Sequence, residues 1–198
     1  MIEKDKQVTV YATMGRILTH LNSLSEQRSL AGNLAAIRNS IGKNYEDAVD
    51  VWPILFRLIP QEYLGNGALN HEEKALLATL QLYALGQQGS NKVSNDDSNN
   101  SMGSSLRDIR ENQSVSLDGR FNTMLTAISF DEFTYHLRQL FKLGKSRSSF
   151  SVNYPALAED LFWYQNGGNK KICLKHNHRV FCTYDTRNQL GTHFLLCP

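Results

Sequence analysis

Apolar residues recur at helical spacing between residues 101 and 165, and short polar segments divide them into four predicted amphipathic helices. The i, i+4, i+7 spacing of a buried helix face occurs in the second and third of these, at Phe121, Leu125 and Ile128 and at Phe133, Leu137 and Leu140. Ser129, followed three residues later by Glu132, has the form of a capping box and predicts where the third helix starts. Pro155 suits the first turn of the fourth helix, where its missing N–H costs nothing.

The first half of the chain shows the same periodicity. It predicts helices over residues 8–22 and 29–41, within the segment 45–59, and over 70–85. Pro53 places the start or a kink of the third of these at Trp52–Pro53, because proline breaks a helix interior. Trp52 then lies on the same side as Phe56, and we interpret it as a core residue. Asn70 with Glu73 caps the last of the four.

Residues 87–101, QQGSNKVSNDDSNNS, separate these two halves. The segment is rich in Asn, Ser and Gly and offers little to bury, which predicts a flexible polar linker. We therefore expect an all-α protein made of two small helical bundles. Its predicted parts are an N-terminal helical part over 1–86, the linker over 87–101, a helical bundle over 102–175 and an irregular tail over 176–198.

Composition narrows the class of protein only slightly. The chain has 198 residues, enough for one domain or two small ones, and its net charge of +2 is too small to indicate nucleic-acid binding by itself. No run approaches the ~20 apolar residues of a membrane helix, and the charged N-terminus lacks the apolar stretch of a signal peptide. Three cysteines near the C-terminus make no disulfide framework. We expect a cytoplasmic protein that does not contact a membrane.

The distribution of charge is more informative than its sum. Residues 133–158 contain four Lys or Arg and no carboxylate, and Arg138, Lys142 and Lys145 recur at i, i+4, i+7. These three cations share one stripe beside the apolar face, where they repel one another unless a polyanion neutralises them. Residues 7–43 carry four cations against one acid, so the charge is segregated along the chain. A solvated surface explains the same pattern, and both interpretations stay open.

Four motifs occur in order in the second half of the chain: S-x-G-x-x-L-R at 101–107, D-x-R-F-x-x-M-L-x-A at 118–127, H-L-R-Q-L at 136–140 and Y-x-x-L-x-x-D-L at 154–161. Together they resemble the small subunit of the type I-E CRISPR surveillance complex, Cascade (the CasB family). Each motif is loose by itself, whereas their order and spacing together are specific. The resemblance extends more weakly back to about residue 8.

The resemblance implies a non-catalytic subunit present as a pair of copies in an RNA-guided complex. Its partners would be the other Cascade subunits, a second copy of itself, crRNA and target or non-target DNA, with no small-molecule substrate and no cofactor. Such a subunit holds strands through their phosphates. The expected nucleic-acid-binding residues are Arg28, Arg38, Lys43, Arg107, Arg110, Arg120, Arg138, Lys142 and Lys145. Arg120 matches the second arginine of the family's D-R-R-F motif, whereas Gly119 replaces the first.

No residues form a recognisable catalytic constellation. The adjacent acids Asp131–Glu132 and Glu159–Asp160 point about 100° apart on a helix, which does not suit shared metal binding. The tail after residue 175 loses helical periodicity and departs from the family. It contains a Cys and His cluster without a standard zinc-finger spacing, so we expect no metal site. The alternatives left open are a free-standing helical nucleic-acid-binding protein and a protein–protein adaptor.

Overall fold

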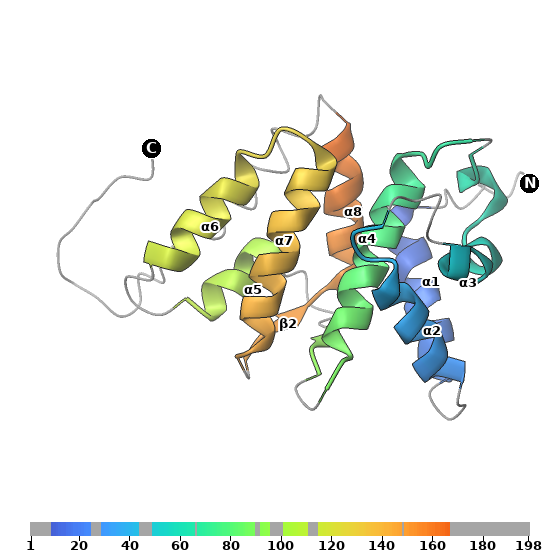
Figure 1. The fold of residues 1–198 in the computed structure, drawn as a ribbon, viewed down its shortest axis with the longest axis horizontal. Helices are drawn as coiled ribbons and strands as arrows, with labels where there is room; N and C mark the ends of the chain where they lie inside the picture. The colour runs from blue at the N-terminus through green and yellow to red at the C-terminus, as the bar shows by residue number, and fades with distance from the viewer. Residues whose placement is uncertain are drawn as a thin grey trace, which may run out of the picture.

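The computed structural model describes residues 9–24, 29–43, 49–65, 67–89, 92–95, 101–110, 115–147 and 149–166. Within these ranges the chain is almost entirely helical, as the sequence predicts (Figure 1). The α-helices are α1 (Val10–Ser23), α2 (Ser29–Asn39), α3 (Trp52–Leu58), α4 (His71–Gly86), α5 (Met102–Asp108), α6 (Val115–Leu125), α7 (Phe130–Lys145) and α8 (Tyr154–Gln165). Two 3-10 helices, η2 (Val49–Val51) and η3 (Gln61–Tyr63), flank α3. Among the described helices, none combines the length and apolar character that crossing a membrane requires.

Side-chain caps fix the starts of the longer helices. The Asn70 side chain accepts a hydrogen bond from the Glu73 backbone N–H while the Glu73 carboxylate accepts one from the Asn70 N–H, which completes the predicted capping box of α4. Ser129 accepts from the N–H of Glu132 at the start of α7. Pro155 lies in the first turn of α8. The helix starts predicted from these residues are therefore confirmed.

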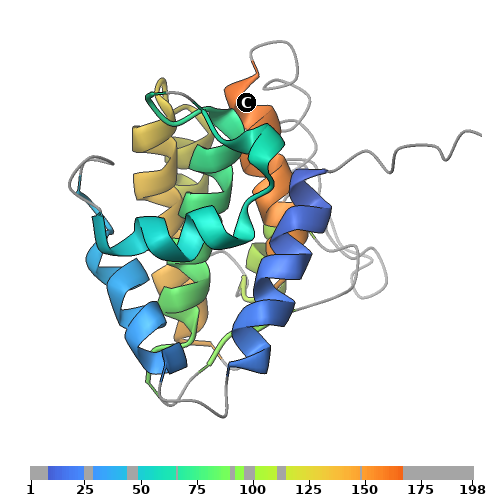
Figure 2. The same ribbon diagram turned by 90° about the vertical axis from the view of Figure 1, so that its right-hand side faces the viewer.

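Helix α4 lies at the centre of the fold. It packs against α8, which also packs against α1, and it contacts α2 on one side and α7 on the other (Figures 1 and 2). Figure 2 shows α3 running crosswise to α1 and α2. Apolar residues from both halves of the chain belong to one continuous core. The two halves therefore share their core rather than each enclosing its own.

Part of the expected linker is packed against this core. Ser94–Asn95 (β1) pairs in parallel with Ser151–Val152 (β2), and Val93 is buried. The Asn95 side chain accepts a hydrogen bond from the N–H of Tyr154 at the start of α8. Lys92, Ser94 and Asn95 are exposed, as expected for a polar segment, whereas the strand pairing and the buried Val93 hold residues 92–95 against the core. The flexibility expected of residues 87–101 stays a prediction.

One residue of the predicted buried faces lies at the surface. Phe121 is buried and Leu125 is partly buried, as expected, but Ile128 is 90% exposed. Helix α6 ends at Leu125, so the helical spacing no longer sets the direction of the side chain three residues later. The predicted tail over 176–198, its Cys and His cluster and Arg28 lie outside the described residues.

Candidate nucleic-acid interface

An open groove with a volume of about 960 Å³ runs along the outer side of α4. Its floor consists of α4 residues that include Leu77, Ala78 and Gln81. One wall comes from α3 and the segment that follows it, and the other from the first half of α7. The groove is therefore built from both halves of the chain, and its shape depends on their shared core.

Cations from three parts of the chain line this groove. They are Arg138 on α7, Lys43, which follows α2, and Lys74 in the first turns of α4. Lys43 is exposed, and Lys142 is exposed one helical turn beyond Arg138. The sequence predicted Arg138, Lys43 and Lys142 as nucleic-acid-binding residues. It did not predict Lys74, because Lys74 lies at the end of the acid-rich stretch 44–74.

Two carboxylates also line the groove, and they differ in accessibility. Glu73 is 4% exposed, and its carboxylate accepts hydrogen bonds from the backbone N–H groups of Asn70 (2.9 Å) and Gly65 (3.3 Å). Asp131 is exposed in the first turn of α7, where a carboxylate is favoured by the helix dipole. The Glu73 carboxylate is therefore buried and hydrogen-bonded to the backbone. Among the described residues that line the groove, Asp131 is the one exposed carboxylate.

At the other end of α4, Arg38 and Lys145 converge on the carbonyls of its last turn. The Arg38 guanidinium donates to the Ala84 carbonyl (3.3 Å), and the Lys145 ammonium donates to the carbonyls of Leu85 (2.6 Å) and Gln88. Burial, and then the nearby charge of Arg38, lower the pKa of Lys145. Cations at a helix C-terminus stabilise its free carbonyls. Arg38 and Lys145, which were both predicted to contact phosphates, therefore link α2 and α7 to the end of α4 through hydrogen bonds.

We call this surface the groove face, meaning the groove together with Lys142, Arg38 and Lys145. The spacing of the α7 stripe predicted correctly that Arg138, Lys142 and Lys145 lie along one side of the helix. The sequence could not show that α2 and α4 bring Arg38, Lys43 and Lys74 to the same side.

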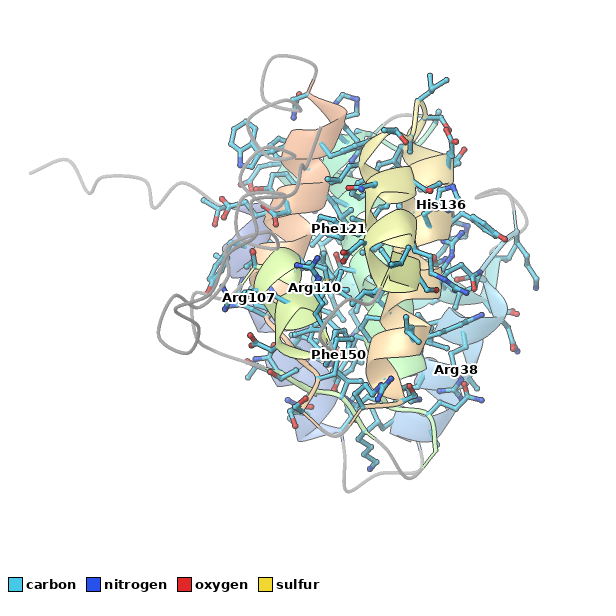
Figure 3. The ribbon with its side chains drawn as sticks, turned by 90° about the vertical axis from the view of Figure 1, so that its left-hand side faces the viewer. Arg38, Arg107, Arg110, Phe121, His136 and Phe150 are labelled. Carbon is cyan, nitrogen blue, oxygen red and sulfur yellow. The ribbon has the colours of Figure 1, made fainter. Side chains whose placement is uncertain are left out.

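The remaining candidates belong to α5, the residues just after it, and α6. Figure 3 shows Arg107 and Arg110 on the opposite side of α6 from Arg38. Arg107 pairs with the neighbouring Asp108 at 3.3 Å, and the less exposed Arg110 pairs with Asp118. Arg120 is exposed on α6. The nine predicted cations therefore do not form one surface, and carboxylates engage two of the arginines that lie apart from the groove.

A stacked pair of aromatic residues, one of them exposed, lies on α3 in the wall of the groove. The rings of Trp52 and Phe56 stack with centroids 5.3 Å apart and planes at 16°. Trp52 is partly buried against the core, as interpreted from the sequence, whereas Phe56 is 50% exposed. Helix α3 is only seven residues long and packs one side inward, which leaves Phe56 in the groove.

The described residues contain no group of three Cys, His, Asp or Glu side chains that could hold a metal ion. Glu132, one of the acids considered for metal binding, accepts a hydrogen bond from the N–H of Ile128 (2.8 Å) at the start of α7. Its role is to complete the helix start. What the groove face offers chemically is charge and an aromatic surface on which a ring can stack.

Comparison with known proteins supports a common fold and a family. The family model for the CRISPR-associated protein Cse2 matches residues 33–181. The crystal structure of CasB from Thermobifida fusca is similar, with a TM-score of 0.68 and 17% identity over 88% of this chain and 98% of that chain. A CRISPR-associated Cse2-family protein from Thermus thermophilus has a TM-score of 0.65 and 20% identity over 85% and 96% of the two chains. No curated protein sequence matches.

Proposed function

Because the chain belongs to the Cse2 (CasB) family, the small subunit of type I-E Cascade, we propose that its groove face holds a nucleic-acid backbone within that complex. The family is a non-catalytic, structural component of Cascade. In RNA-guided complexes base pairing reads the sequence, while protein side chains hold the strands through their phosphates. A surface of spaced cations without a catalytic centre suits this division of labour.

The observation that carries the proposal is the convergence of cations from both halves of the chain on one groove. The groove is lined by Arg138 from α7, by Lys43 from the segment after α2 and by Lys74 from α4, and Lys142 is exposed one helical turn beyond Arg138. Like charges held close together by the fold repel one another, and a polyanion relieves that repulsion. Each phosphate neutralised by such a cation also releases counterions, which favours binding.

The contributions of the individual cations are expected to differ. Lys142 and Lys43 are exposed, and Arg138 lines the groove beside them, so in this proposal these three carry most of the phosphate contact. Arg38 and Lys145 already donate to carbonyls of α4, so they add long-range attraction more than direct contact. The other described candidates, namely Arg107, Arg110 and Arg120, form a second and weaker surface, because two of them are paired with carboxylates.

The partners follow from the family and remain part of the proposal. The chain would assemble with the other Cascade subunits and a second copy of itself, close to crRNA and to target and non-target DNA. The groove face would stabilise the R-loop by holding a backbone, whatever its sequence.

Salt dependence of DNA binding tests this proposal. The purified chain should bind generic single-stranded DNA, and the plot of log K against log salt should have a slope of about −2 to −3, which corresponds to roughly three phosphate contacts. Fluorescence anisotropy of labelled DNA at a series of salt concentrations measures this slope. Binding that is absent at low salt, or that does not weaken as salt rises, contradicts a phosphate-holding surface.

A further inference from the structure

We propose that the groove also binds one unpaired base of single-stranded DNA, stacked on the exposed ring of Phe56. This inference rests on the proposed function and adds a base-binding position to the phosphate-holding surface. It starts from an aromatic pair that the phosphate contacts do not use. The same groove that presents the cations presents this pair.

The aromatic pair has the geometry of a stacking platform. Trp52 is anchored against the core, and its ring lies nearly parallel to that of Phe56 at 5.3 Å. The inner ring therefore supports the outer one and limits its motion. Phe56 remains 50% exposed in the wall of the groove, so one face of its ring is open to a ligand. Every base has a π face that can cover such a ring, whatever its sequence.

The surroundings of the pair favour a nucleotide over an apolar ligand. Lys43, Lys74 and Arg138 line the same groove and can reach phosphates on either side of a stacked base. Two carboxylates stand against these three cations: Glu73, which accepts hydrogen bonds from backbone N–H groups, and the exposed Asp131 in the first turn of α7. The volume of about 960 Å³ lies within the range of small-molecule sites and leaves room for a nucleotide.

The occupant must be unpaired for this contact to form. In a duplex or an RNA–DNA heteroduplex the faces of the bases are covered by their neighbours. R-loop formation displaces one DNA strand as a single strand, which leaves its bases free to stack on aromatic side chains. We therefore assign the site to single-stranded DNA, held by its phosphates and by one base.

The test compares Phe56→Leu with the wild-type full-length chain on two probes of equal length. One probe is oligothymidylate, and the other is the same deoxyribose-phosphate backbone without bases. Phe56→Leu should bind oligothymidylate at least about fivefold more weakly, as expected for loss of one stacked base, and should bind the abasic strand with unchanged affinity. Tyr11→Leu is the matched control, since Tyr11 is also an exposed aromatic residue but lies on α1, outside the groove.

Tryptophan fluorescence gives a second readout that requires no change at the site. The chain contains two tryptophans, so Trp163→Phe leaves Trp52 as the sole emitter. Oligothymidylate should then quench or shift the emission of Trp52, and the abasic strand at equal saturation should do so much less. A large response to both probes, or to neither, overturns base stacking at this position.

The possible failures are distinguishable. If the wild-type chain binds neither probe in a salt-dependent way, the proposed function fails as a whole. If it binds both probes equally and Phe56→Leu changes neither affinity, the phosphate-holding surface stands and the base site is wrong. If Phe56→Leu binds both probes normally but is lost from the assembled complex, the aromatic pair contacts another protein subunit, which also overturns the inference.

Discussion

The double variant R138E/K142E should bind single-stranded DNA at least about tenfold more weakly than the wild-type chain, with a shallower salt dependence. The two carboxylates would stand where phosphates are expected to lie. Lys142 is exposed and Arg138 lies in the wall of the groove, outside the buried face of α7, so folding should survive the change. Anisotropy measures the binding, and a thermal melt checks the fold.

R107E/R120E is the matched control, because it makes the same change of charge on α5 and α6. We expect this variant to lose clearly less affinity than R138E/K142E, since the groove face would be intact. Equal losses for the two variants would mean that DNA responds to the total charge of the chain. Unchanged affinity and salt slope for R138E/K142E, in a variant that melts like the wild-type chain, would mean that the stripe is only solvated surface.

Phe141→Ala should lower the free energy of unfolding by about 3–5 kcal/mol, the usual loss for a fully buried phenylalanine. Phe141 is 0% exposed, and its ring contacts Phe150 edge-on with centroids 5.5 Å apart. It also packs against Gly86 at the end of α4, where a Cβ atom would lie 3.2 Å from the Phe141 ring. Because both halves of the chain meet here, denaturant should still unfold the variant in one transition.

Tyr154→Phe is the control for this measurement. Tyr154 is also 0% exposed, but its hydroxyl has no hydrogen-bond partner among the described residues, so the change removes a polar atom and leaves the ring in place. Its unfolding free energy should stay the same or rise by about 1 kcal/mol. Two separate transitions in the Phe141→Ala chain, with one half unaffected, would contradict the shared core.

The helices were predictable because their signals are local. Capping residues such as Asn70 and Ser129 act within a few residues of the chain, and the apolar spacing of α7 reports directly which side is buried. Ile128 and Val93 show where local signals end. The exposure of Ile128 depends on the residue at which α6 ends. The burial of Val93 depends on a partner strand that lies 57 residues further along the chain, counted from Ser94 to Ser151.

The candidate site was predictable only in part. The stripe of Arg138, Lys142 and Lys145 follows from helix geometry alone. That Lys145 and Arg38 donate to the last carbonyls of α4 depends on how three helices pack, which spacing along the chain does not encode. The groove arises from the same packing. For that reason the sequence pointed to a basic surface but missed Lys74 and the exposed ring of Phe56.

Lysine reactivity in the assembled complex tests the central claim most directly. Acetylation with mass spectrometry would be compared with and without bound target DNA. We expect DNA to protect Lys43, Lys74 and Lys142, and to leave Lys92, which is exposed outside the groove, unchanged. Lys145 should react slowly in both states, because its ammonium donates to two carbonyls. If Lys43, Lys74 and Lys142 react equally with and without DNA, the groove face does not hold a nucleic-acid backbone.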